Sequence, residues 1–407
     1  MNRGSSPIIH LNEIPLNTSD IPRSELDIAA QTRTNPLPWK GQFSPQLIEV
    51  LLRTYASAAS HVLDPFVGSG TVLGECARRD LAATGVEVNP AAAILARIYS
   101  FANEPKRHRA LLWESANNAL ERLASTLESA ALGEAPTELR PQAIANLTAA
   151  DLPSDLVKAA LVLSDPTWSS VRPDRLRDSM KKLRELLHIL PHTSKPIRVI
   201  QGDARRVPLR SGSVDLVLTS PPYINVFNYH QQYRPAVEAL GHDVLEAARS
   251  EIGSNRKHRM NRFLTVVQYT IDMAAVLSEA NRVTRPGGRL IVVIGRESRV
   301  RGLQILNGDL LCAVASTVDG VHVEMRQERC FVNRYGERIV EDILHLRTNG
   351  SATSRLEHSS ARQVGVGVLE QLLPAAQRDV RADVAAAIDA ASTVKASPLH
   401  DAEVPRR

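Results

Sequence analysis

The chain has 407 residues, of which 43% are hydrophobic and 23% charged, and its formal net charge is +5 at pH 7. A chain of this length is expected to form one elaborated domain or two. Arginine far outnumbers lysine, which favours forked contacts to phosphates or base edges and so permits, without requiring, a nucleic-acid partner. No apolar run approaches the roughly 20 residues of a membrane helix, and the first residues lack an apolar signal core. We therefore expect a cytoplasmic protein with no membrane partner.

The three cysteines are scattered along the chain and form no CxxC pair; they are Cys76, Cys312 and Cys330. Neither a metal site nor a disulfide framework is indicated by this spacing. We expect no metal and a reducing compartment.

Short β-rich runs alternate with longer helical patterns, which predicts a doubly wound, mostly parallel α/β sheet. The runs are HVLD (61–64), ATGVEV (83–88), IRVIQ (197–201), SVDLVLT (213–219) and RLIVVIG (289–295). Near the end, HVEMRQERCFVN and RIVEDILHLR flank Tyr335-Gly336 and predict an antiparallel hairpin that closes the sheet.

The segment 101–196 is rich in Leu, Ala, Glu and Arg at helical spacing, and it is far longer than a crossover needs. It predicts a helical insertion between two halves of the core, 35–100 and 197–349. Residues 1–34 and 350–407 are expected to be an N-terminal tail and a peripheral C-terminal segment.

The residues that follow each predicted strand are where a ligand is expected, because open α/β sheets bind ligands beyond the carboxyl ends of their strands. The first run is followed by DPFVGSGTVLGE, in which Gly68, Ser69 and Gly70 allow a tight turn and close backbone approach to a cofactor. Taken alone, this glycine spacing also fits a dinucleotide loop or a purely structural turn.

Acidic residues follow the second and third runs. Glu87 stands where a carboxylate accepts both hydroxyls of a ribose, although a solvated surface glutamate would look the same. Asp203, followed by Ala204, stands where an acidic side chain could bond an adenine amino group, or only cap a turn. Three strand ends that each suit an adenosine-containing cofactor make chance coincidence a poor explanation.

The fourth run ends in Ser220-Pro221-Pro222-Tyr223, and proline cannot continue a strand ladder. With DPFVGSGT at 64–71, this loop resembles the S-adenosylmethionine-dependent amino-methyltransferases, above all the DNA enzymes that modify cytosine N4 or adenine N6. The resemblance covers roughly 36–100 and 197–347 and implies a seven-stranded Rossmann-like sheet and S-adenosyl-L-methionine as cofactor. Site-specific methylation of double-stranded DNA, beside a cognate restriction or defence nuclease, is the activity that it implies.

The resemblance also implies roles for individual residues. At the methionine end of the cofactor it implies Trp39 as a candidate, together with Lys40, Phe43 and Ser44. The cofactor-binding candidates are Asp64, Pro65, Phe66, Gly68, Ser69, Gly70, Thr71, Glu87, Asp203, Ala204, Lys40, Phe43 and Ser44. The catalytic candidates are Ser220, Pro221, Pro222 and Tyr223.

The physical chemistry of the transfer agrees with these roles. An exocyclic amine is a poor nucleophile because its lone pair is delocalised, and accepting its hydrogens at Ser220 and the Pro221 carbonyl would localise that pair. Tyr223 would stack on a base extruded from the duplex. Cytosine C5 chemistry is disfavoured because no cysteine follows a proline. Serine at position 220 favours cytosine N4, with adenine N6 as the alternative.

Two regions compete for DNA contact. The first is the loop at about 224–263, which is dense in types that bind phosphates and base edges: Asn228, Arg256, Lys257, Arg259 and Arg262. The second is RPDRLRDSMKKLRELL (172–187) in the insertion, which also reads as an amphipathic packing helix.

Three other functions remain open at this point. An RNA base methyltransferase would share the Pro-Pro-aromatic loop, an NADP-dependent oxidoreductase would share only the glycine pattern, and a non-catalytic DNA-binding relative would be expected to lose Ser220 or the glycines. The half that carries the glycine loop (35–100, the cofactor half) precedes the half that carries the Ser220–Tyr223 loop (197–349, the SPPY half), whereas many related DNA enzymes have the reverse order. This difference leaves the oligomeric state open, because dimer surfaces in these enzymes depend on which elements are peripheral.

Overall fold

The computed structural model describes residues 10–28, 32–132, 151–166, 171–224, 228–253, 258, 260–333, 336–351 and 358–401. Its centre is a seven-stranded sheet with the order β3-β2-β1-β4-β5-β9-β8. The strands are β1 (His61–Asp64), β2 (Ala82–Glu87), β3 (Ile197–Gln201), β4 (Val214–Thr219), β5 (Thr284–Gly295), β8 (Val321–Val332) and β9 (Arg338–Thr348). Strands β1 to β5 pair in parallel, and β9 runs antiparallel to both β5 and β8. The predicted doubly wound, mostly parallel sheet with a terminal hairpin is confirmed.

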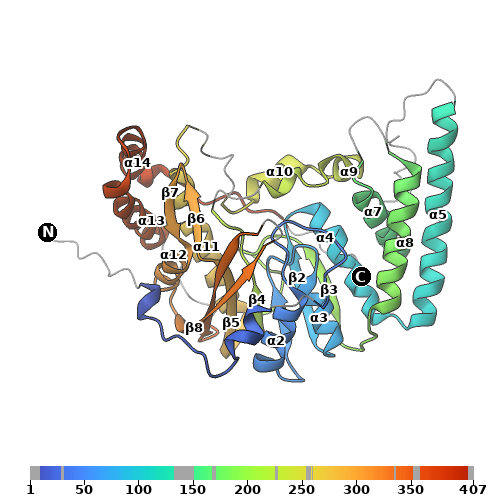
Figure 1. The fold of residues 1–407 in the computed structure, drawn as a ribbon, viewed down its shortest axis with the longest axis horizontal. Helices are drawn as coiled ribbons and strands as arrows, with labels where there is room; N and C mark the ends of the chain where they lie inside the picture. Colours follow the sequence, from blue (N-terminus) through green and yellow to red (C-terminus); the bar gives the residue numbers. More distant parts are fainter. Residues whose placement is uncertain are drawn as a thin grey trace.

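Each central strand buries both of its faces, as strands of a parallel sheet do. Because side chains alternate along a strand, Val62 of β1 enters one hydrophobic core and Leu63 enters the other. The same alternation divides Ile291 and Val293 from Leu290 and Val292 on β5. The sheet is therefore the middle layer of three (Figure 1).

Two sets of helices cover the two faces of the sheet. One core contains residues of α2 (Pro45–Tyr55), α3 (Thr71–Arg78) and α4 (Pro90–Arg97), and the other contains residues of α11 (Leu264–Val283), α12 (Asn307–Ala315), α13 (His358–Leu372) and α14 (Arg378–Ala390). Two shorter helices, α9 (Arg234–Ala239) and α10 (Val244–Ser250), lie in the loop after β4, along one edge of the fold (Figure 1).

Between β2 and β3 the chain forms α5 (Lys106–Leu132), α7 (Leu152–Leu163) and α8 (Pro173–Ile189), which stand side by side at one end of the molecule (Figure 1). The buried Arg109 joins α5 to the end of α8, because its guanidinium donates to the carbonyls of Leu187, Leu190 and Pro191. Helix α7 contacts α4, so the three helices rest on the core.

The C-terminal segment differs from the expectation of a peripheral tail. Helix α13 packs on α11, and beyond α14 the chain returns to the centre, where Ser397 donates from its backbone N and its Oγ to Asp272 at 2.8 Å and 2.5 Å. Ser397 and Asp272 are both buried. The composition of 350–407 is rich in Ser, Arg and Ala, which is typical of exposed segments, but a small serine also fits beside a buried carboxylate.

Two further features were not expected from the sequence. The N-terminal segment contains η1 (Leu11–Glu13) and α1 (Arg23–Asp27), and it is held against β8 by the hydrogen bond from Asn17 N to Arg326 O at 2.8 Å. Strands β6 (Glu297–Val300) and β7 (Leu303–Leu306) form a small separate hairpin. Across the described ranges, no helix combines the length and apolarity needed to cross a bilayer.

Candidate active site

The sheet order reverses between β1 and β4, and a cavity that is open to solvent lies at this switch point. The carboxyl ends of β1, β2, β3 and β4 all contribute to its lining, through Pro65, Glu87, Gly202 and Ser220 respectively. A switch point in an open α/β sheet is where ligands bind, because the loops on either side of it diverge and leave a crevice.

Most of the candidates from the sequence meet in this one cavity. Fifteen of the eighteen cofactor and catalytic candidates line it: Trp39, Lys40, Phe43, Pro65, Phe66, Gly68, Ser69, Thr71, Glu87, Asp203, Ala204, Ser220, Pro221, Pro222 and Tyr223. The other three are Asp64, Gly70 and Ser44, which are not among its lining residues. Gly70 and Ser44 are the N-cap residues of α3 and α2.

The glycine loop between β1 and α3 is shaped by close packing. Gly68 and Gly70 have φ of +51° and +92°, a left-handed conformation that favours glycine. A Cβ on Gly70 would lie 2.6 Å from Cδ2 of Tyr99, so no side chain fits there. The buried Asn35 side chain links this loop to Tyr99, because it donates to Thr71 Oγ1 at 3.0 Å and accepts from Tyr99 Oη at 2.8 Å.

Asp64 supports the cavity rather than lining it. Its Oδ1 accepts from the backbone N of Phe66 at 3.1 Å and from Oγ1 of Thr219 at 2.6 Å. These bonds join the end of β1 to the end of β4, directly before the SPPY loop. Burial of the carboxyl raises the pKa of Asp64 to about 7.

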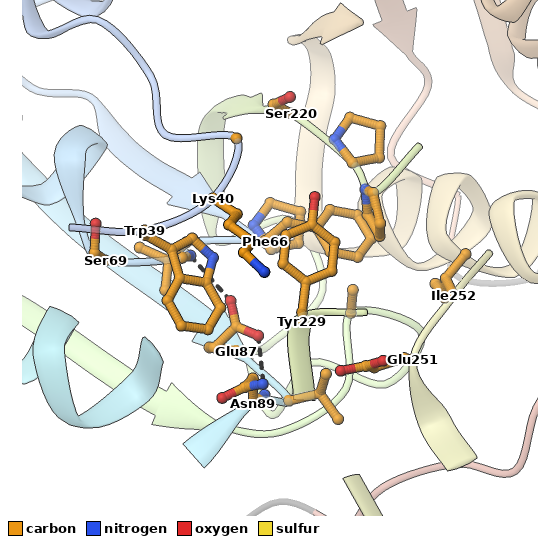
Figure 2. A pocket seen from close by; sticks show the side chains of 18 of the residues that line it. Trp39, Lys40, Phe66, Ser69, Glu87, Asn89, Ser220, Tyr229, Glu251 and Ile252 are labelled. Carbon is orange, nitrogen blue, oxygen red and sulfur yellow. Dashed lines mark hydrogen bonds between the residues drawn. The ribbon is translucent and has the colours of Figure 1, made fainter. Parts of the chain in front are cut away.

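Glu87 points into the cavity from the end of β2 (Figure 2). Its Oε2 accepts from Gly68 N at 3.0 Å and its Oε1 accepts from Asn89 N at 2.9 Å. Each oxygen has two lone pairs, so each can still accept one hydroxyl. Burial raises the pKa of Glu87 to about 7. Asn89 in turn caps α4, because its Oδ1 accepts from Ala91 N at 2.9 Å.

The SPPY loop forms another wall of the cavity. Tyr223 packs against the end of β5, where a Cβ on Gly295 would lie 3.2 Å from its Cε2 atom. Burial raises the pKa of the Tyr223 phenol, and this effect is opposed by hydrogen bonds with Ser220 and the Gly295 backbone. The phenol is therefore a fixed neutral group, and Ser220 lies beside it.

A further wall comes from Trp39, which was a candidate, and from Tyr229, which no local motif marked. Tyr229, in η3 (Tyr229–Gln231), stacks on Trp39 with ring centroids 6.1 Å apart and planes at 15° (Figure 2). The two segments are also joined by Gln232 Nε2 and Tyr233 Oη, which both donate to Pro38 O at 3.2 Å. The aromatic residues after the SPPY loop were the available signal, but their spacing does not indicate which of them turns toward the cavity.

Glu251 also lines the cavity and lies opposite Glu87 and Asn89 in Figure 2. It follows α10, and its Oε2 is 2.8 Å from Nδ1 of the buried His230. Ser250 and Ile252 also line the cavity, and Ser250 O accepts from Nη2 of Arg205, two residues after Asp203, at 3.4 Å.

The residues proposed for DNA contact are only partly placed. Asn228 precedes η3, and Arg262 is exposed just before α11. Arg256, Lys257 and Arg259 lie outside the described residues.

On α8 several charged groups have partners within the insertion itself. Arg177 pairs with Glu121 and Glu128 of α5 at 2.9 Å and 2.7 Å, and Arg184 lies over the ring of Trp113 at 4.6 Å. Across the described ranges, no group of three His, Cys, Asp or Glu residues is arranged to hold a metal ion.

No protein-family model matches the chain. A 61-residue stretch is 34% identical to the Type II methyltransferase M.MjaII of Methanocaldococcus jannaschii, and the match covers 15% of this chain and 12% of that protein. The chain therefore aligns with only about an eighth of that relative's length.

Similar solved structures include TrmN of Thermus thermophilus, with 15% identity and a TM-score of 0.33 over 76% of this chain and 50% of that chain. A SAM-dependent methyltransferase of Methanosarcina mazei is 12% identical, with a TM-score of 0.33 over 73% of this chain and 96% of that chain. At these values the similarity does not extend to activity or substrate.

Proposed function

We propose that this chain transfers a methyl group from S-adenosylmethionine to the exocyclic amine of a base flipped out of DNA, with cytosine N4 as the target. One observation carries the proposal: the SPPY loop and the glycine loop, which lie far apart in the sequence, are walls of the same cavity at the switch point of the sheet. The matched stretch of the Type II methyltransferase supports the same reaction class.

The described residues fit the cofactor. Glu87 has one acceptor site left on each oxygen for the two ribose hydroxyls, and Gly68 of the glycine loop lines the cavity beside it, with its N–H bonded to Glu87 Oε2. The methionine end would lie between this loop and the segment Trp39–Phe43. When bound, the cofactor supplies an electrophilic methyl group on a sulfonium. The acidic side chains around the cavity suit that positive charge.

The SPPY loop would hold the target amine. Ser220 Oγ and the Pro221 carbonyl are proposed to accept its two hydrogens, which localises the nitrogen lone pair toward the methyl group. Fixed acceptors of this kind act by positioning and electrostatics, and they need no strong base. Tyr223 is held by its packing on Gly295 and would present the rest of its ring to the flipped base.

For recognition of DNA we propose the segment that follows the SPPY loop rather than α8. Two described residues of this segment, Tyr229 and Glu251, line the cavity that the base would enter, which supports this choice. The Arg177 and Arg184 side chains of α8 are engaged within the insertion, as the packing interpretation of that helix predicts.

Nucleoside mass spectrometry on DNA from a methylation-deficient host that expresses the chain tests the proposal. N4-methylcytosine is the expected product, and the Pro221→Ala variant should abolish it while binding of S-adenosylhomocysteine is largely retained. The matched control is Pro208→Ala, because Pro208 is exposed and does not line the cavity. N6-methyladenine would keep the chemistry and overturn the choice of base. Loss of both marks in a protein that still binds the cofactor would direct the test to RNA.

A further inference from the structure

Asp203 occupies the position expected to bond the adenine amino group, but its carboxylate is saturated. Its Oδ1 accepts from N and Nε of Arg205 at 2.9 Å and 2.8 Å, and its Oδ2 accepts from Arg205 Nη2 at 2.6 Å and His400 N at 3.1 Å. A carboxylate has about four acceptor sites, and these four donors use them. Asp203 therefore lines the cavity without an acceptor site to offer.

The partners of Asp203 are themselves fixed. The Arg205 side chain is 2% exposed, and its Nη1 donates to Asp272 Oδ1 at 2.9 Å and to Ser397 O at 2.8 Å. Freeing an oxygen of Asp203 would leave a buried guanidinium or a backbone N–H without its acceptor, which is costly. Asp203 is thus part of a structural network in this chain.

A second carboxylate reaches the same end of the cavity. Glu251 lines it together with Ser250 and Ile252, and the carbonyl oxygen of Ser250 accepts from Nη2 of Arg205 at 3.4 Å, so these residues adjoin the segment that carries Asp203. Its side chain is 6% exposed, and His230 fixes its orientation through the 2.8 Å contact between Nδ1 and Oε2. Glu251 is close enough to Glu87 to contribute to the raised pKa of that residue.

We propose that Glu251, positioned by His230, accepts a hydrogen from the 6-amino group of the cofactor's adenine and thereby selects adenosine over 6-oxopurine nucleosides. This inference rests on the proposed function, since it assigns the base-reading group of the same cofactor site. A 6-oxopurine presents a carbonyl oxygen where adenine presents an N–H donor, so it would direct an acceptor toward the carboxylate.

Isothermal titration of S-adenosylhomocysteine and S-inosylhomocysteine tests the assignment, because the two ligands differ only in the base. The wild-type chain should bind the adenosine compound at least about tenfold more tightly, as expected for a hydrogen bond to a charged acceptor. Glu251→Gln should reduce that ratio to about twofold or reverse it, because an amide can donate to the carbonyl. Effects of the substitution on the ribose and homocysteine parts, which the two ligands share, cancel in the ratio.

Two variants serve as controls. Glu246→Gln removes an exposed carboxylate from the neighbouring α10 and should keep the wild-type ratio. Asp203→Asn should also keep the ratio, even if it lowers stability. His230→Gln should reduce the selectivity less than Glu251→Gln does, which keeps the proposal testable if one variant folds poorly.

The outcomes are distinct. A wild-type ratio that survives in Glu251→Gln, or one that collapses in Asp203→Asn, overturns the assignment. Equal binding of the two ligands by the wild-type chain also overturns it. If the wild-type chain binds neither ligand, the proposed function itself fails.

Discussion

Trp39 and Tyr229 stack nearly parallel on the wall of the cavity, with ring centroids 6.1 Å apart, although Trp39 belongs to the half 35–100 and Tyr229 to the half 197–349. Trp39 also covers the glycine loop, since a Cβ on Gly68 would lie 3.0 Å from its Cδ1 atom. The indole therefore links the proposed methionine end of the site to the segment that follows the SPPY loop.

Trp39→Ala is expected to weaken binding of S-adenosylhomocysteine by about two- to tenfold, because an aromatic pair contributes roughly 0.5–1.5 kcal/mol beyond its buried area. Titration calorimetry measures the loss. Ligand binding should also change the tryptophan fluorescence of the wild-type chain but not that of Trp39→Phe. The matched control is Trp113→Phe, which lies in the insertion beneath Arg184 and should keep the signal.

Affinity for S-adenosylhomocysteine is expected to fall as the pH is lowered from 8 to 6. Burial raises the pKa of Glu87 to about 7, so the empty site takes up a proton in this range and loses acceptor sites for the ribose hydroxyls. Well below the pKa the loss approaches about tenfold per pH unit.

Glu87→Gln separates this group from Asp64, whose pKa is also raised to about 7 by burial. The variant should bind weakly at every pH with a much flatter profile, because Asp64 does not line the cavity. A profile as steep as that of the wild-type chain would assign the titration to another group. The effect on stability has the opposite sign. Because the pKa values of Asp64 and Glu87 are higher in the folded state than in the unfolded state, the free energy of unfolding is expected to increase as the pH falls from about 7 to about 4, where the unfolded chain also takes up these protons.

Gly70→Ala is expected to lower the free energy of unfolding by about 2–5 kcal/mol. The left-handed backbone costs an alanine roughly 1–2 kcal/mol, and the new Cβ would lie 2.6 Å from Tyr99, which adds an overpacking cost of about 1–3 kcal/mol. Gly241→Ala is the matched control, because Gly241 has φ of +87° but nothing within 4 Å of the added Cβ. Equal losses in urea unfolding would show that Tyr99 moves aside freely.

The strand ends could be predicted because their signals are local. A buried strand followed by Gly68-Ser69-Gly70 or by Pro221-Pro222 marks both the strand and the residues just beyond it. The sheet order then brings these ends together, since parallel strands carry their carboxyl ends to one edge.

The partners of those residues could not be predicted in the same way. The saturation of Asp203 depends on Arg205, which is near in sequence, but also on His400, which is nearly two hundred residues away. Glu251 carries no motif, and its place in the cavity follows from the packing of α10 and η3. Tertiary contacts of this kind leave no periodic trace in one sequence.

Arg109→Met is expected to destabilise the chain by about 3–5 kcal/mol. The guanidinium donates to the carbonyls of Glu104, Leu187 and Pro191 among others, and an apolar replacement leaves these buried acceptors unpaired. Urea unfolding measures the loss, and Arg107→Met at the exposed neighbouring position should change little. A small effect at both positions would mean that this residue contributes little to holding α5 against the end of α8.

Ser397→Ala is expected to lower the free energy of unfolding by about 1.5–3 kcal/mol, because it removes a buried hydrogen bond to the charged Asp272. Ser392→Ala, at an exposed position shortly before it, is the control and should be neutral. Because Asp272 also holds Arg205, which holds Asp203, the loss should be accompanied by weaker binding of S-adenosylhomocysteine. Unchanged stability would instead support the interpretation of the C-terminal segment as peripheral, since a loosely held segment has no buried hydrogen bond to lose.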